Sequence, residues 1–145
     1  MAIKTLRATG EMGAGMTIEI MCGEHKVYMD QPKNAGGADR GPAPPELILA
    51  AYAGCVGSLG RIIAFQEKID LRGMSFDVEA DYDPDCLLGR ETTARAGFQE
   101  VRLKVKIDAD LDDADKQAFL EKIEKRCPVA DNLINSTKVV AVLDK

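Results

Sequence analysis

A long apolar segment with a cysteine inside it constrains the fold more than any other feature of this chain. Between Glu46 and Arg61 there are 14 residues without a charged side chain, and Cys55 is one of them. A segment of this length is too short to cross a bilayer and fits a helix buried in a protein core. We therefore expect a central helix that shields Cys55 from solvent.

The flanking residues predict where this helix begins and ends. The loop before it, residues 33–45, is rich in Gly, Pro and Ala. Pro45 suits the first helical position, and Glu46 favours the positive end of the helix dipole. Gly73 is a stop signal, so the helix is expected to run to about Ile69.

Glycines recur along one side of the predicted helix. Gly54, Gly57 and Gly60 would each cost roughly 1 kcal/mol relative to alanine in a helix interior. Such a cost indicates that another segment packs here too closely for a side chain. That segment belongs either to the same chain or to a second subunit, and the residues alone leave both interpretations open.

Strands are predicted on both sides of the helix. Residues 16–21 and 26–29 should pair around a Gly23-Glu24 turn, with residues 3–8 as an additional strand before them. Apolar and charged residues alternate over 76–82 and 101–107, as is typical of half-buried strands. Opposite charges on their polar faces favour a hairpin, with a loop at 84–96.

The rest of the chain predicts two helices and a last strand. Asp112 can cap a helix that runs to about Arg126, a short helix begins at Pro128, and residues 138–143 close the chain as a strand. At 145 residues the chain can bury a substantial core without cross-links. We expect one α+β domain over residues 1–145.

Composition argues against several classes of protein. The 19 Lys and Arg are outnumbered by 24 Asp and Glu, which gives a net charge of -5 and disfavours a nucleic-acid surface. The amino end lacks the apolar core of a secretory signal, and no segment reaches the length of a membrane span. We expect a cytoplasmic protein with reduced thiols, no membrane and no nucleic-acid partner.

Four cysteines are spaced singly, so with one histidine they do not predict a zinc site. Burial alone would make Cys55 inert unless a positive group lies close, and an arginine is a better candidate activator than the histidine, His25. Cys127 precedes a helix start, where backbone amides favour the thiolate. Cys22 and Cys86 are expected to be small buried apolar residues.

Two motifs together make the sequence recognisable. The run GPAPPELILAAYAGC, which ends at Cys55, and the run CPVADNL, which begins at Cys127, resemble the OsmC/Ohr family of osmotically inducible and organic-hydroperoxide-resistance proteins. The resemblance covers nearly the whole chain. It implies an intertwined α+β homodimer, with antiparallel sheets around long central helices and two active sites at the interface. It also implies reduction of organic hydroperoxides through paired cysteines.

The same resemblance assigns roles to individual residues. Cys55 matches the peroxidatic cysteine, Cys127 the resolving cysteine and Glu46 the family's helix-start glutamate. The organic-hydroperoxide branch has an arginine in an amino-terminal Gly-Arg turn, where this chain reads GEMG over residues 10–13. Arg40 is the predicted substitute, with Lys33 behind it, and an ordinary solvated arginine is the alternative.

Helix geometry restricts how Glu46 can act. It precedes Cys55 by nine residues, which places the two roughly 13 Å apart along one helix. Glu46 therefore cannot touch its own Cys55. If the two act together, as the resemblance implies, the glutamate comes from a neighbouring chain. Otherwise it serves only the helix dipole.

The implied mechanism is a two-thiol cycle. Cys55 reduces the hydroperoxide and becomes a sulfenic acid, Cys127 condenses with it to a disulfide, and an external thiol reductant restores both. No bound cofactor is required. Two alternatives stay open: a dimeric binding protein that kept the fold without useful peroxidase activity, and a cysteine hydrolase or acyl transferase, for which no histidine base is evident.

Overall fold

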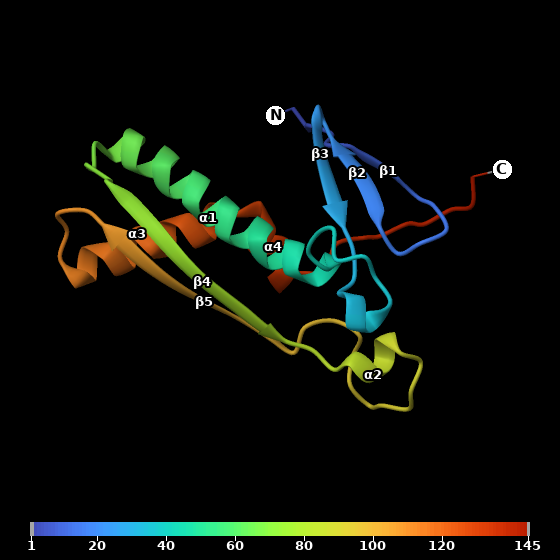
Figure 1. Ribbon diagram of the computed structural model, residues 1–145. Coiled ribbons are helices and arrows are strands. Elements are labelled where there is room, and N and C mark those ends of the chain that lie inside the picture. Colours follow the sequence, from blue (N-terminus) through green and yellow to red (C-terminus); the bar gives the residue numbers. More distant parts are fainter. Residues whose placement is uncertain (1, 145) are drawn as a thin grey trace. The chain divides into compact units, whose positions relative to one another are not determined.

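The computed structural model describes residues 2–144, which form two compact units that divide between Ile48 and Leu49. The first unit contains a three-stranded antiparallel sheet of order β1-β2-β3, and the second contains the two-stranded antiparallel sheet β4-β5 (Figure 1). Helix α1, Pro44–Glu67, begins in the first unit and continues into the second. The expected α+β class with antiparallel sheets is confirmed.

The amino-terminal sheet consists of β1, Ala8–Met12, β2, Ile18–Cys22, and β3, His25–Met29. The predicted β2-β3 pair is confirmed, and Gly23 between them has the positive φ of 63° that a tight turn requires. The prediction of a strand over residues 3–8 is wrong, because β1 begins only at Ala8. Ala8 pairs with Cys22, where β2 turns away, so earlier residues have no neighbour on β2.

Helix α1 starts and stops for local reasons. Pro44 and Pro45 occupy its first turn, and Glu46 Oε2 accepts a hydrogen bond from the backbone N of Ala43 at 2.8 Å. The helix ends at Glu67 because Lys68 adopts a left-handed conformation with φ 56°. It is therefore slightly shorter than predicted at its carboxyl end, and the predicted stop signal, Gly73, is the first residue of β4.

By length and composition, α1 is apolar enough to cross a membrane. It has 24 residues, and an 18-residue window has a mean hydropathy of 1.7, with 28% of that window buried within the chain. The expectation that no segment reaches this length is therefore wrong, because the helix extends beyond the charge-free stretch at both ends. A single helix of this kind is weak evidence for a span, because core helices of soluble proteins have the same properties.

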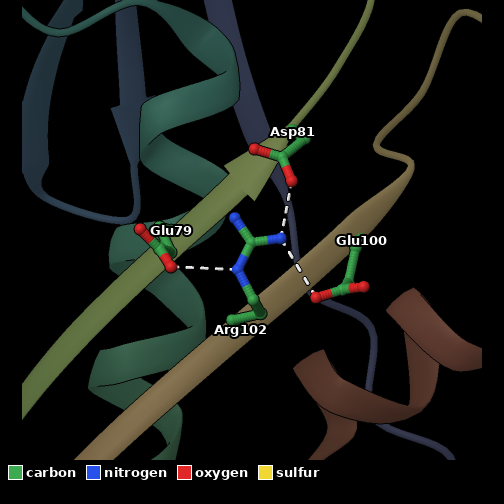
Figure 2. A network of polar contacts seen from close by, with 4 residues as sticks. All are labelled: Glu79, Asp81, Glu100 and Arg102. Carbon is green, nitrogen blue, oxygen red and sulfur yellow. Dashed lines mark hydrogen bonds and ion pairs between the residues drawn. The ribbon is translucent and has the colours of Figure 1, made fainter.

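The predicted hairpin is confirmed as β4, Gly73–Asp81, paired with β5, Glu100–Asp108. On its solvent face, Arg102 contacts Glu79 at 2.9 Å, Asp81 at 2.6 Å and Glu100 at 3.0 Å (Figure 2). The Glu79 and Arg102 pair is the expected cross-strand charge pair. Such exposed ion pairs contribute little to stability. They mark the solvent face of the hairpin, and the apolar residues of β4 and β5 pack on the core from the opposite face.

The connection between β4 and β5 is less simple than the predicted loop. It contains a one-turn helix, α2, Pro84–Leu87, which Asp83 caps by accepting a hydrogen bond from Asp85 N at 2.9 Å. Asp83 also accepts from the Thr92 hydroxyl at 2.7 Å. These contacts give the polar segment a local structure that its composition alone did not indicate.

The two carboxyl-terminal helices are confirmed as α3, Asp113–Arg126, capped by Asp112, and α4, Pro128–Ile134. The strand expected over residues 138–143 is wrong, because no strand within residues 2–144 lies beside it to share backbone hydrogen bonds. Its apolar side chains are 70–86% exposed, namely Val139, Val140, Val142 and Leu143.

The core of the second unit lies between α1, α3 and the inner face of the hairpin (Figure 1). Val56, Ile63 and Ile123 are at most 1% exposed at its centre. A Cβ at Gly57 would lie 3.0 Å from Phe76, and one at Gly60 would meet Met74 and Ile123.

These two glycines therefore make room for side chains of the same chain, whereas a Cβ at Gly54 would meet nothing within 4 Å in the described part of the chain. A bulky residue at Gly57 would accordingly disturb packing within the chain and would not report on subunit association.

Candidate active site

Two cysteines that are 72 residues apart in sequence meet in the second unit. Cys55 lies in the middle of α1, and Cys127 is the single residue between α3 and α4. Both are free thiols, and the Cys127 thiol donates a hydrogen bond to Cys55 Sγ at a sulfur-to-sulfur distance of 2.8 Å. The structure therefore brings together the two cysteines that the sequence motifs single out.

The burial of Cys55 differs from the expectation that its helix shields it from solvent. Cys127 is 1% exposed and belongs to the core, whereas Cys55 is only half-buried. Cys55 lies at the edge of the buried face of α1, next to Val56 at its centre. The sulfur on the long apolar helix is consequently the one that a small molecule reaches more easily.

Cys127 caps the helix that follows it. Its backbone is extended, with φ -80° and ψ 110°, and its Sγ accepts a hydrogen bond from Ala130 N at 3.3 Å. That bond favours the thiolate, but burial and the hydrogen bond to Cys55 act more strongly and raise the pKa of the Cys127 thiol. The expectation that the helix start makes Cys127 a thiolate is therefore wrong, because desolvation outweighs the cap.

This pKa shift predicts a pH dependence of stability. Because the pKa of Cys127 is higher in the folded chain, the unfolded chain loses this proton first as pH rises. The stability that it contributes is complete below the unfolded pKa of about 8.5 and is lost as pH rises toward the folded value. The free energy of unfolding should therefore fall more steeply above about pH 8.5 in wild type than in Cys127→Ser. Serine retains a capping oxygen, and equal slopes in urea unfolding would contradict the prediction.

A second contact ties the same two segments together beside the sulfurs. The Tyr52 hydroxyl donates a hydrogen bond to Glu124 Oε1 at 2.5 Å, and Tyr52 is 8% exposed. Burial, followed by this hydrogen bond, raises the pKa of the Tyr52 hydroxyl far above its ordinary value, so it stays a donor. Sequence reasoning missed this pair, although each member lies three residues before a cysteine, a spacing that places neighbours on one helical face.

Glu46 and Arg40 have their contacts in the first unit. Glu46 closes the first turn of α1 through its bond to Ala43. The backbone N of Arg40 donates to the buried carboxylate of Asp30 at 3.2 Å, and its guanidinium lies 4.6 Å from the centre of the Tyr28 ring. Cys55 and Cys127 belong to the second unit, and the contacts of Glu46 and Arg40 within the first unit do not place either side chain beside them.

Arg40 also lines an open hollow on the first unit. The hollow has a volume of about 310 Å³, and Glu11, Gly13, Glu19 and Tyr28 line it as well. Glu11 and Gly13 belong to the GEMG segment, so Arg40 lies beside the residues that stand where the resemblance places a Gly-Arg turn. The structure thus gives Arg40 a defined stacked position next to that segment.

The remaining sulfur and imidazole groups lie elsewhere. Cys22 and Cys86 are exposed, so the expectation that they are small buried apolar residues is wrong. Cys22 ends β2 at a turn, opposite His25 on β3, and Cys86 lies on the one-turn helix α2. Both positions are on edges or turns, where the backbone leaves side chains open to solvent.

Comparisons with known proteins agree with this fold. A family model for OsmC-like protein matches residues 36–142. Among solved structures, an OsmC-like protein from Mycoplasma pneumoniae has a TM-score of 0.79 at 18% identity, covering 92% of this chain and 89% of that chain. No curated protein matches the chain.

Two further structures carry organic hydroperoxide resistance in their names. One is the organic hydroperoxide resistance protein OsmC from Legionella pneumophila, with a TM-score of 0.68, 27% identity and coverage of 94% of this chain and 93% of that chain. The other is OhrB of Bacillus subtilis, with a TM-score of 0.58, 21% identity and coverage of 93% and 94%. Since the family model spans most of the chain and includes both paired cysteines, this chain belongs to the OsmC-like protein family.

Proposed function

We propose that this protein is a thiol-dependent peroxidase that reduces organic hydroperoxides to alcohols. The observation that carries the proposal is the contact between Cys55 and Cys127, two free thiols 2.8 Å apart at the edge of an apolar core. The resistance to organic hydroperoxides named for the Legionella relative supports the same activity. We place peroxidatic chemistry on Cys55 and resolution on Cys127.

The proposed roles follow from burial and hydrogen bonding. Cys127 is buried and donates its proton toward Cys55, so it remains the thiol of the pair, while the half-buried Cys55 accepts and is free to attack. The Cys55 thiolate attacks the outer peroxide oxygen and the O–O bond breaks. The alkoxide leaves and takes up a proton as an alcohol, and Cys55 becomes a sulfenic acid.

The second step closes the disulfide. Cys127 attacks the Cys55 sulfenic sulfur, an S–S bond forms, and the hydroxyl leaves as water after taking the Cys127 proton. An external dithiol then supplies two electrons and two protons and restores both cysteines. Apolar neighbours such as Val56 and Val129 around the pair favour an alkyl hydroperoxide over hydrogen peroxide.

The proposal includes a homodimer. In each chain, the two compact units together form one OsmC-like domain over residues 1–145. Glu46 lies about 13 Å along α1 from Cys55, so it would act on the Cys55 of a second copy. Arg40 is proposed as the activating cation, because it is stacked on Tyr28 beside the segment from which the family's arginine is missing. A Cβ at Gly54 would meet nothing within 4 Å among residues 2–144, which leaves space on this helix for the backbone of a neighbouring chain.

Thiol titration tests the proposed activity. In a Cys22→Ser, Cys86→Ser background only the proposed pair can react, because these four cysteines are all that the chain contains. One equivalent of cumene hydroperoxide should remove two thiols per chain and release one equivalent of alcohol, and dithiothreitol should restore both thiols. Unchanged thiol content after hours with excess hydroperoxide would instead favour a dimeric binding protein without this chemistry.

A further inference from the structure

We propose that Tyr52 and Glu124 are positioning residues whose hydrogen bond holds Cys127 within reach of Cys55 for disulfide formation. This inference rests on the proposed function, since it concerns the second step of that cycle. Among the described residues, no hydrogen bond joins the Tyr52 or Glu124 side chain to either sulfur, and each acts through the cysteine three residues after it. Together with the contact between the two sulfurs, this bond links the segments that carry them.

The position of this link makes it specific to the cysteine pair. Tyr52 and Cys55 lie one turn apart on α1, and Glu124 lies on the last turn of α3, where its carbonyl accepts a hydrogen bond from Cys127 N at 3.3 Å. The Tyr52 to Glu124 bond thus joins the end of α3 directly to the turn of α1 that precedes Cys55. Movement of that end would carry the Cys127 backbone with it.

The other polar links between α1 and α3 lie farther along α1. Lys122 contacts Glu67 at 2.8 Å and Arg126 contacts Gln66 at 2.9 Å, and all four side chains belong to exposed residues. Glu67 and Gln66 are at least 11 residues beyond Cys55, which is roughly 16 Å of helix. Arg126 directly precedes Cys127, but its partner Gln66 lies that far from Cys55, whereas the Tyr52 to Glu124 bond reaches the turn of α1 next to Cys55.

The bond is also of a strong kind. A largely buried phenol that donates to a carboxylate at 2.5 Å forms a charge-assisted hydrogen bond, which is shorter and stronger than a neutral one. The donor side of this bond is buried with Tyr52, whereas Glu124 is an exposed residue. Because attack at sulfur requires close and aligned partners, a displacement of about 1 Å at such a site can slow a reaction by about 100-fold.

A chromogenic aromatic disulfide tests this role without any hydroperoxide. In the Cys22→Ser, Cys86→Ser background, Cys55 attacks the reagent, forms a mixed disulfide and releases one aromatic thiolate. Cys127 then attacks the Cys55 sulfur, closes the Cys55–Cys127 disulfide and releases a second aromatic thiolate. In Tyr52→Phe the second release should slow by about tenfold or more, while the first should stay within about twofold of wild type.

Variants at the acceptor separate positioning from a general loss of structure. Glu124→Gln keeps an oxygen that accepts from Tyr52 and should retain most of the second rate, whereas Glu124→Ala should match Tyr52→Phe. Glu124 is an exposed residue, so its truncation keeps the test valid even if Tyr52→Phe folds poorly. Glu121→Ala, one turn earlier on α3, is the matched control and should leave both phases unchanged.

The outcomes distinguish this inference from the proposed function. A second phase that is equally fast in wild type, Tyr52→Phe and Glu124→Ala would overturn the positioning role, whatever the response to hydroperoxide. If the wild-type protein completes both phases with the reagent but never consumes hydroperoxide, the proposed peroxidase activity is contradicted and the positioning role stands.

Discussion

Cys55→Ser should lose hydroperoxide reductase activity by at least about 10³-fold, because the proposed nucleophile is gone. Its remaining partner, Cys127, is 1% exposed and has a raised pKa, so it should stay largely unreacted after addition of peroxide. Cys127→Ser should behave differently. It should consume one equivalent of peroxide and then stop, with Cys55 trapped as sulfenic acid or more highly oxidised sulfur.

Peptide mass spectrometry after a dimedone trap distinguishes these products. The label should appear on the Cys55 peptide of Cys127→Ser, and no label should appear on the Cys127 peptide of Cys55→Ser. Cys86→Ser, which removes an exposed thiol outside the pair, should leave turnover unchanged and serves as the control. Label on Cys127 in the Cys55→Ser protein would reverse the assigned roles.

Mixing two inactive variants should restore activity if the proposed dimer is correct. Glu46→Gln leaves Cys55 intact, and Cys55→Ser leaves Glu46 intact. A heterodimer of the two reunites one intact cysteine with the partner's intact glutamate. Random exchange gives half heterodimers with one competent site of two, so the mixture should recover about a quarter of wild-type activity.

The glutamine variant is chosen to keep the start of α1 intact. Its side-chain oxygen can still accept the hydrogen bond from Ala43 N that Glu46 accepts at 2.8 Å, so lost activity would not reflect a frayed helix. Exchange should be checked by native mass spectrometry with chains of different tag length. Verified heterodimers without activity, or a fully active wild-type monomer by light scattering, would contradict a shared site.

Tertiary packing explains why several local predictions failed. Alternation of apolar and charged residues marked β4 and β5 correctly, because one face of the hairpin packs on the core and the other carries Arg102 and its acidic partners. A different signal, the continuous apolar run within residues 138–143, was misleading. An apolar run becomes a strand only where another backbone shares its hydrogen bonds, and the described chain provides none there.

The glycines of α1 show the same limit. Their number indicated close packing, but the sequence could not say against what. Gly57 and Gly60 accommodate Phe76, Met74 and Ile123 of the same chain, whereas Gly54 does not. Three glycines on one helix thus have different surroundings, because the side chains that lie beside each glycine depend on how β4 and α3 cross α1.

The sequence by itself determined the α+β class, the central helix and the two cysteine motifs, because these depend on local periodicity, turn residues and short runs. Only the tertiary structure decided that Cys55 and Cys127 lie 2.8 Å apart, that Cys127 is the more buried sulfur and that Tyr52 bonds to Glu124 beside them. Each of those facts depends on where α3 ends against α1. Both contacts join residues that are 72 positions apart in the chain, and the packing of the core brings those residues together.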